Sequence, residues 1–334
     1  MTQRSHPEVV VITGATAGVG RATAEAFARQ GAHIGLLARG QERLESTRRR
    51  IEELGGKAIG ISTDVADAEQ VERAAARVEE EFGPIDVWVN NAMTSVFSPA
   101  IEIEPEEYKR VMEVNFLGFV HGTQSALERM LPRNRGSIVL VGSALAKRGI
   151  PLQAPYCASK HAIQGYFESL RTELLHDDSD IKLSIVHLPA INTPQFDWVK
   201  SRLDNRAQPV PPIYQPEVAA DAIVYAAHND RREVYVGAPT VKTIFGNRIA
   251  PWYADRYLAK NGYDGQQTDE PEDPNRPNNL WEPAPGDPGA HGRFDDRNPR
   301  ARSPQLWATQ HRTELGLAAI GIGLAIGLTA GLRS

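Results

Sequence analysis

Cysteine is almost absent from this chain, and other features that mark particular classes of protein are weak or missing. The 334 residues include one cysteine, Cys157, which excludes an intramolecular disulfide and a metal site built from cysteines alone. The formal charge of -5 gives no reason to expect a nucleic-acid partner. The histidines are scattered without metal-ligand spacing, so we predict no metal site. Residues 1–9 lack the apolar segment of a secretory signal, which favours a cytoplasmic location.

The N-terminal residues predict a phosphate-binding unit. Residues 9–12 form a β-branched run that suits a buried parallel strand, and Thr13-Gly14-Ala15-Thr16-Ala17-Gly18-Val19-Gly20 follows directly. An alanine-rich helix is expected over residues 21–30. Glycines let the backbone approach a pyrophosphate closely, and a helix N-terminus offers free N–H groups and a partial positive charge. A strand, a glycine-rich turn and a helix in this order therefore indicate a dinucleotide site.

The residue after the second predicted strand bears on the choice of cofactor. That strand covers residues 33–38, and the next residue usually meets the adenosine ribose. An acidic side chain there would repel a 2′-phosphate, but this chain has Ala38 and then Arg39. A guanidinium suits a phosphate by its charge and its fork geometry. We therefore predict NADP(H) over NAD(H), although Ala17 leaves the glycine-rich turn without a second basic residue; the alternative is that Arg39 is a solvated loop cation.

Strands and helices continue to alternate along the chain, which predicts an α/β fold. A third strand over residues 57–62 leads to Asp64 and Val65, and a fourth over 85–89 ends in Asn90-Asn91-Ala92-Met93. Residues 106–130 predict a long helix that contains Asn115, which is unfavourable there unless its amide has a partner. Later strands are expected over residues 137–142, 181–188 and 233–237.

The stretch from residue 143 to residue 160 holds the strongest candidates for chemistry. Tyr156 and Lys160 are four residues apart, a spacing that puts two side chains on one face of a helix. A phenol has a pKa of about 10, and an adjacent ammonium group lowers that pKa by favouring the phenolate. The pair could exchange a proton with a substrate oxygen, and Ser143 could hydrogen-bond the same oxygen. The same spacing occurs by chance in many helices, so the pair becomes specific only beside a dinucleotide site.

Taken together, these stretches resemble the short-chain dehydrogenase/reductase family over about residues 7–240. The matching residues, in order, are Thr13-Gly14-x-x-x-Gly18-x-Gly20, Asp64-Val65, Asn90-Asn91-Ala92, Asn115, Ser143, Tyr156-x-x-x-Lys160 and Pro189-Ala190-x-x-Thr193. The resemblance implies one Rossmann-type domain with a doubly wound parallel sheet of about seven strands. It also implies NAD(P)-dependent hydride transfer at an alcohol or carbonyl carbon. Met93 and Ala190 replace usual glycines of the family, and neither change removes a group that does chemistry.

The resemblance also assigns expected roles to individual residues. Tyr156 would give a proton to the carbonyl oxygen, Lys160 would lower its pKa and hold the nicotinamide ribose, and Ser143 would orient the carbonyl. Asn115 would anchor a water in a proton relay. The residues expected to bind the cofactor are Thr13, Gly14, Thr16, Gly18, Val19, Gly20, Arg39, Asp64, Val65, Asn90, Tyr156, Lys160 and Thr193.

The end of the chain differs in composition from the rest. We expect a catalytic domain over residues 1–265, with a lid at about 193–214, followed by a disordered or extended polar linker over 266–312 that contains eight prolines between Pro271 and Pro304. Residues 313–334 form a hydrophobic tail in which 18 residues, 315–332, are uncharged. As a helix this run would span ~27 Å, close to the bilayer core of roughly 30 Å. We predict a membrane anchor; the alternative is a helix buried in an oligomer interface or against the body.

These observations lead to one principal hypothesis and one from another class. The first is an NADP(H)-dependent oxidoreductase that acts on a small carbonyl or alcohol substrate, which we expect to be apolar. The second is an NADP(H)-binding sensor or scaffold without turnover, which the presence of both Tyr156 and Lys160 disfavours. A homo-oligomer is expected only because members of the family commonly assemble in this way.

Overall fold

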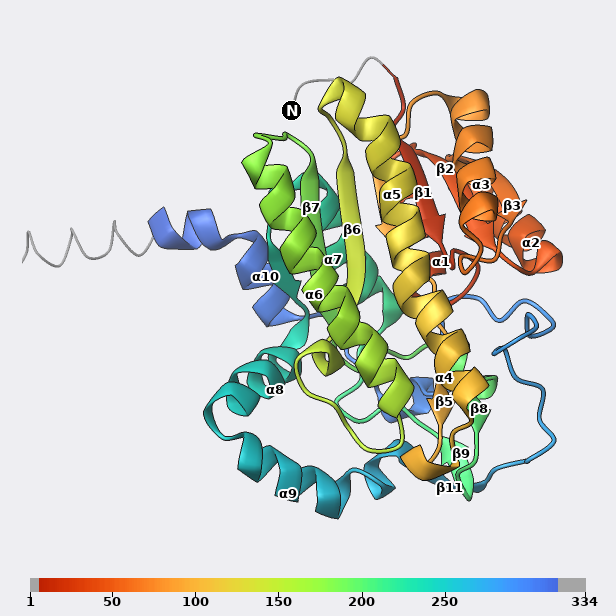
Figure 1. The fold of residues 1–334 in the computed structure, drawn as a ribbon, viewed down its shortest axis with the longest axis vertical. Helices are drawn as coiled ribbons and strands as arrows, with labels where there is room; N and C mark the ends of the chain where they lie inside the picture. The colour runs from red at the N-terminus through yellow and green to blue at the C-terminus, as the bar shows by residue number, and fades with distance from the viewer. Residues whose placement is uncertain (1–5, 318–334) are drawn as a thin grey trace, which may run out of the picture.

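The computed structural model describes residues 6–317, and its centre is a parallel sheet of seven strands (Figure 1). The strand order is β10-β7-β6-β4-β1-β2-β3. The sheet confirms the predicted Rossmann-type α/β fold. Its strands are β1 (Val9–Thr13), β2 (His33–Ala38), β3 (Lys57–Ser62), β4 (Val87–Asn90), β6 (Ser137–Ser143), β7 (Lys182–Leu188) and β10 (Glu233–Tyr235).

Helices cover both faces of this sheet (Figure 1), and the strands are buried on both sides. In β1, Val10 and Ile12 join one apolar cluster and Val9 and Val11 join the other, because successive side chains of a strand point to opposite faces. The first cluster lies beneath α1 (Gly18–Ala28), α2 (Gln41–Glu53) and α7 (Pro216–His228). The second lies beneath α3 (Ala68–Phe82), α5 (Gly118–Met130) and α6 (Ala154–His176).

The long helix predicted over residues 106–130 is interrupted. It consists of α4 (Pro105–Met112), a π-helical turn (Glu113–Leu117) and α5. Asn115 lies within the π-helical turn, where its buried amide bonds to neighbouring segments rather than to its own helix. A π-helical turn inserts one residue into the helical repeat and is frequent at functional sites.

The lid is tied to the body by a buried carboxylate and by aromatic packing. Its short strands β8 (Lys200–Ser201) and β9 (Asn205–Ala207) pair with β5 (Val96–Phe97) and β11 (Gln267–Pro271). The Glu107 carboxylate is 1% exposed and accepts hydrogen bonds from Lys200 and from Arg202, the latter at 2.9 Å. Phe196 packs edge-on against Phe294, with 5.5 Å between ring centroids. These contacts hold the lid against residues from both earlier and later parts of the chain.

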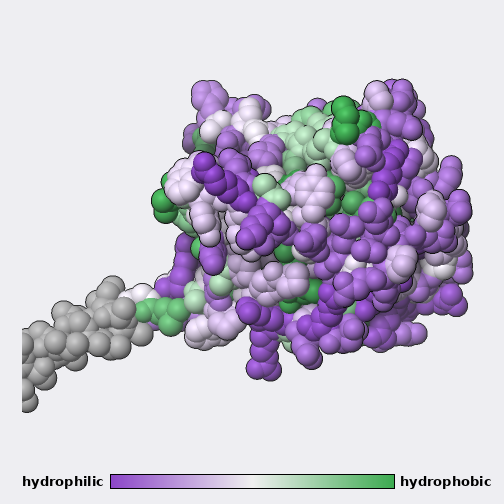
Figure 2. Space-filling model, turned by 90° about the horizontal axis from the view of Figure 1, so that it is seen from below, coloured by the Kyte–Doolittle hydropathy of each residue, from purple (hydrophilic) through white to green (hydrophobic). Residues whose placement is uncertain are grey.

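Two helices that follow the last strand of the sheet project from the body of the molecule (Figure 1). They are α8 (Gly237–Ile249) and α9 (Pro251–Asn261), and α9 contains no buried residue. Viewed from this end, the surface is mainly hydrophilic, with apolar side chains in separate groups (Figure 2). The exposed aromatic residues of α9 are Trp252, Tyr253 and Tyr257.

The segment after residue 265 takes the extended form of the predicted linker, and it is fastened to the surface of the domain. Strand β11 pairs with β9, and the following residues run along the outside of the domain to α10 (Pro304–Gln310) (Figure 1). Leu280, Phe294 and Leu306 are at most 2% exposed in three different apolar clusters. Three well-spaced apolar residues are enough to fasten this extended chain to a preformed surface, which its composition alone does not reveal. We call residues 276–294 the C-terminal strap.

The hydrophobic tail lies almost entirely outside the described residues. The structure shows a short helical turn up to residue 317, and the predicted anchor over residues 313–334 continues beyond it. Between residues 6 and 317, no helix is both long enough and apolar enough to cross a bilayer. Membrane attachment and assembly into a homo-oligomer stay predictions.

Candidate functional site

A single cavity of about 1360 Å³ connects most of the predicted site residues. It begins at the glycine-rich turn between β1 and α1, passes the carboxyl ends of the central strands, and opens between the lid and α8–α9. Ligands of open parallel sheets bind at this edge, where the strand order reverses between β1 and β4. The predicted residues that line the cavity are Gly14, Thr16, Gly18, Val19, Arg39, Asp64, Val65, Ser143, Tyr156, Lys160 and Thr193.

The glycine-rich turn has the backbone shape that requires glycine. Gly14 and Gly18 have φ of +64° and +53°, in the left-handed region that costs other residues energy. A Cβ atom on Gly20 would lie 2.2 Å from the carbonyl oxygen of Gly14, so Gly20 lets the first turn of α1 pack onto the loop. The N-terminus of α1 therefore faces the cavity, where its partial positive charge favours an anion.

Three arginines surround the end of the cavity next to the end of β2, which we call the adenosine end because the sequence predicts that the adenosine ribose lies there. Arg39 and Arg43 line it directly, and Arg110 forms an ion pair with Asp64 at 2.6 Å. Burial and the nearby charge of Arg110 lower the pKa of Arg39. Among the described residues, neither Arg39 nor Arg43 forms an ion pair within 4.0 Å, and both donate to backbone carbonyls of the C-terminal strap. An anion at this end of the cavity would therefore meet two cationic side chains without a carboxylate partner.

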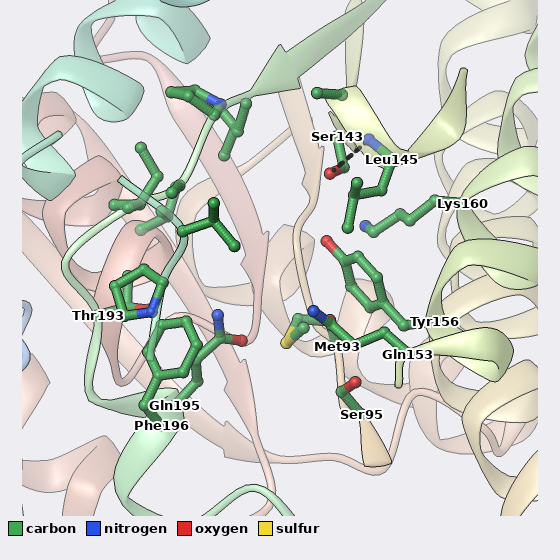
Figure 3. Close-up of a pocket in the computed structure, with 18 of the residues that line it drawn as sticks. Met93, Ser95, Ser143, Leu145, Gln153, Tyr156, Lys160, Thr193, Gln195 and Phe196 are labelled. Atoms are coloured by element: carbon green, nitrogen blue, oxygen red, sulfur yellow. Dashed lines mark hydrogen bonds between the residues drawn. The ribbon is translucent and has the colours of Figure 1, made fainter. Parts of the chain in front are cut away.

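Ser143, Tyr156 and Lys160 form one wall in the middle of the cavity (Figure 3). Ser143 ends β6, and Tyr156 and Lys160 project from the first turns of α6. The phenol oxygen of Tyr156 points into the cavity, and Thr193, Gln195 and Phe196 lie on the opposite wall (Figure 3). The Lys160 ammonium donates to the carbonyl of Val141 at 2.8 Å and lies 5.6 Å from the centroid of the Tyr156 ring.

Burial controls the ionisation of this wall. It raises the pKa of Tyr156 to about 12, although a hydrogen bond with Ser143 acts in the opposite direction. It also lowers the pKa of Lys160 to about 7. The lowered phenol pKa expected from the sequence is therefore absent in this structure, because the effect of burial outweighs that of the Ser143 hydrogen bond. The neutral phenol is the dominant form of Tyr156.

Asn115 lies behind this wall and is completely buried. Its side-chain oxygen accepts from the backbone N–H of Thr94 at 2.8 Å, and its Nδ2 donates to the carbonyl of Thr94 and to the hydroxyl of Ser159, both at 3.0 Å. Ser159 stands between Tyr156 and Lys160 in α6. The amide thus connects the π-helical turn, the loop after β4 and the start of α6, which fixes the position of the tyrosine.

Three residues that were expected to touch the cofactor lie outside the cavity lining. The hydroxyl of Thr13 accepts from the backbone N–H groups of Asn91 and Ala92. The buried amide of Asn90 bonds to Trp88 and Thr123. With Gly20, these residues support the loops from beneath, because a residue at the end of a buried strand points into the core as often as into the site.

Sequence reasoning missed other residues that do line the cavity. Asn91 lines it directly after the buried Asn90, and Met93 lies near Tyr156 (Figure 3). Arg43 also lines the cavity from the first turn of α2, which begins just after the loop that carries Arg39. Asn279, Pro283 and Ala284 of the C-terminal strap also line the cavity, and nothing in their local sequence indicates it.

Known proteins are similar to this chain in both sequence and fold. The family model for short chain dehydrogenase matches residues 8–203. "Uncharacterized oxidoreductase YxnA" of Bacillus subtilis (strain 168) is 34% identical over 277 residues, 82% of this chain and 78% of that protein. "Dehydrogenase/reductase SDR family member 7B" of Bos taurus is 36% identical, over 55% of this chain and 58% of that protein.

Solved structures agree with these matches. A crystal structure of an actinorhodin polyketide ketoreductase variant with NADPH has a TM-score of 0.61 and 29% identity, and covers 69% of this chain and 95% of its own. An alcohol dehydrogenase from the archaeon Thermococcus sibiricus, complexed with 5-hydroxy-NADP, has a TM-score of 0.58 and 28% identity, with 69% and 94% covered. The glycine-rich turn, the wall of Ser143, Tyr156 and Lys160, and these matches lead to one conclusion: the chain belongs to the short-chain dehydrogenase/reductase family of oxidoreductases.

Proposed function

We propose that this protein transfers a hydride between NADP(H) and the alcohol or carbonyl carbon of an apolar substrate. The observation that carries the proposal is the position of Tyr156. Its phenol oxygen projects into the middle of a cavity that has a phosphate-binding turn at one end and an apolar chamber at the other. A substrate oxygen in that chamber can reach the phenol while a dinucleotide lies along the turn.

The residues of the wall have separate parts in the proposed reaction. NADPH, when bound along the turn, supplies the hydride. Tyr156 donates a proton to the substrate oxygen, Ser143 donates a hydrogen bond that orients it, and Lys160 stabilises the phenolate that remains. The raised pKa of Tyr156 keeps the phenol protonated before reaction, which is the form needed for reduction. Asn115 acts as a positioning residue through Thr94 and Ser159.

The chain's own residues fit a nicotinamide dinucleotide. The two positive-φ glycines shape the turn, and a Cβ on Gly14 would lie 2.8 Å from the Cα of Ala92, so glycine is needed for the turn to pack against the loop after β4. The N-terminus of α1 suits the pyrophosphate, and Asp64 and Val65 border the adenine end. The two similar structures named above contain NADPH and 5-hydroxy-NADP, which supports the same class of cofactor here.

The apolar chamber supports an apolar substrate. Phe97, Phe196 and Ile150 line it from the body and lid, while Tyr253 and Leu258 line it from α9. Aromatic and aliphatic walls with a few polar groups are typical of sites for apolar small molecules. Phe196 both packs within the lid's apolar cluster and lines the cavity.

Arg39 tests the preference for NADP(H). We expect Arg39→Ala to raise KM for NADPH by about 10- to 100-fold relative to NADH, because a charged hydrogen bond contributes about 1.5–3 kcal/mol. Steady-state kinetics with both cofactors measure this difference. Arg49→Ala is the matched control, since Arg49 is 65% exposed on the solvent side of α2. Equal losses with NADPH and NADH would show that Arg39 only holds the C-terminal strap.

The function itself is tested by turnover of the full chain. Oxidation of NADPH and of NADH would be followed against a panel of apolar ketones, aldehydes and quinones. NADPH-dependent turnover supports the proposal. Tight NADPH binding without turnover on any compound would favour the sensor or scaffold hypothesis, which the complete wall of Ser143, Tyr156 and Lys160 makes the weaker of the two.

A further inference from the structure

The C-terminal strap lies across the outer side of the dinucleotide site. Its first residues contact the lid: the Arg276 guanidinium donates to the carbonyl of Val199 at 2.9 Å, and the Asn279 N–H donates to the carbonyl of Trp198 at 2.9 Å. Its last residues contact the loop after β7, where the Gly292 N–H donates to the carbonyl of Asn192 at 3.2 Å. The strap therefore reaches from one border of the cavity to the other.

Between these ends the strap is bound by the arginines of the adenosine end. Arg39 donates to the carbonyls of Asn279 and Trp281 at 2.6 and 2.5 Å. Arg110 donates to the carbonyl of Leu280 at 3.0 Å, and Leu280 is completely buried. Arg43 donates to the carbonyls of Pro285 and Gly286 at 2.9 and 2.6 Å. Five backbone carbonyls of the strap are thus occupied by three cationic side chains.

The strap also meets the phosphate-binding turn. The Asp287 carboxylate accepts from Arg21 of α1 at 2.5 Å and from the hydroxyl of Ser46 in α2. Burial acts to raise the pKa of Asp287, but the hydrogen bonds from Arg21 and Ser46 outweigh it and hold this pKa below its usual range. Next to it, the carbonyl of Gly289 accepts from the N–H of Gly18, the first residue of α1, at 3.2 Å. Asp287 therefore fastens the strap to both helices that border the site.

The strap leaves room beneath it. Asn279, Pro283 and Ala284 line the same cavity as Arg39, Gly40 and Asp64, so they face the adenosine end from the outside. A segment that occupied the cofactor's own place would fill this space instead of bordering it. The strap therefore borders the cavity without filling it. The two strap carbonyls that accept from Arg39 keep its guanidinium at the same border.

We propose that the C-terminal strap is part of the cofactor site, which it encloses at the adenosine end, and that Asp287 is the anchor that sets how fast the cofactor leaves. The inference rests on the proposed dinucleotide site. A bound dinucleotide would lie between the glycine-rich turn and the strap, and its release would require the strap to separate from α1 and α2. Loosening the anchor then speeds release without altering the wall that holds Tyr156.

The test compares release of NADPH from the full wild-type chain and from Asp287→Ala. Stopped-flow fluorescence, with excess NADP⁺ to prevent rebinding, gives the rate constant, and NADH is measured in parallel. We expect about a tenfold faster release and a similarly raised Kd for Asp287→Ala, since one charge-assisted contact corresponds to roughly that factor. Ser46→Ala, which removes one donor to Asp287 and is mild for folding, should change release in the same direction by a smaller factor. Asp296→Ala is the matched control, because Asp296 is an exposed aspartate just after the end of the strap.

The possible results separate a failure of the strap proposal from a failure of the proposed function. Hydrogen exchange adds an independent measurement: NADPH should slow amide exchange over residues 279–289 in the wild type and less so in Asp287→Ala. An unchanged rate of NADPH release in both Asp287→Ala and Ser46→Ala would overturn the proposed role of the strap but not the proposed cofactor site. A lower Kd for NADPH in Asp287→Ala would also overturn the strap proposal, because that result is expected if the strap competes with the cofactor for the same space. A wild type that binds neither NADPH nor NADH would overturn the proposed function and the strap with it.

Discussion

Tyr156→Phe is expected to lower kcat by about 10²- to 10⁴-fold, the range that general acid–base catalysis contributes. Phenylalanine keeps the ring and its packing but has no proton to give to the substrate oxygen. The phenol is the group that projects into the cavity (Figure 3), whereas the Ser143 hydroxyl already accepts the N–H of Leu145 at 3.1 Å. The KM for NADPH should change little, because the glycine-rich turn and the arginines are untouched.

The measurement is steady-state turnover of a ketone that the wild type reduces. Tyr166→Phe is the matched control: it removes the same atom from the same helix, and Tyr166 packs against Phe116 away from the cavity. NADPH titration by fluorescence confirms that each variant still binds the cofactor. Full turnover by Tyr156→Phe would show that another group gives the proton.

Lys160→Met is expected to lower kcat by about 10²-fold or more, because it removes the charge that stabilises the phenolate. The same variant should be more stable than the wild type near pH 7 in the absence of cofactor. Lys160 is 2% exposed, and replacing a buried charge by an apolar side chain of similar length is often stabilising. Activity and stability would then change in opposite directions at one residue.

The pH dependence of this stability difference follows from the pKa of Lys160. Burial lowers it from 10.5 to about 7, so between these values the unfolded chain holds a proton that the folded chain has lost. The contribution of Lys160 to the free energy of unfolding therefore rises with pH across this window. Below the window the lysine is charged in both states and the burial cost is fully present. The stability margin of Lys160→Met should narrow from pH 7 to pH 9.5, as thermal unfolding of both proteins can measure; a margin that widens would contradict the assignment.

The sheet and the position of the site were predictable because they depend on local patterns. The β-branched run before the glycine-rich turn predicts β1, and the spacing of four between Tyr156 and Lys160 predicts their common wall. Parallel strands expose their carboxyl ends at one edge, which brings residues as distant as Gly14 and Tyr156 to one cavity. These inferences need only the alternation of strands and helices.

The strap and the ionisation of the wall were not predictable in this way. Leu280 is an isolated leucine in a proline-rich segment, and its burial depends on a surface formed by Val96, Ile103 and Val111 far earlier in the chain. The sequence predicts that Arg39 meets a phosphate, and nothing in the local sequence of Arg43 or Arg110 indicates that either binds the strap. The pKa of Tyr156 depends on how much water the surrounding atoms exclude, a quantity that spacing along a helix does not contain.

The edge-to-face contact between Phe196 and Phe294 has a consequence for how the protein is made. All seven strands of the sheet lie between residues 9 and 235, so the sheet has its full set of strands once the ribosome has translated that part. The lid's apolar cluster includes Phe294 and cannot be completed until a further stretch of chain has emerged. Domains fold during synthesis at about 5–20 residues per second, so a nascent chain passes several seconds with a formed sheet and an incomplete lid. During that interval the apolar face of Phe196 is open to chaperones, and a chain released early near residue 265 would keep it open permanently.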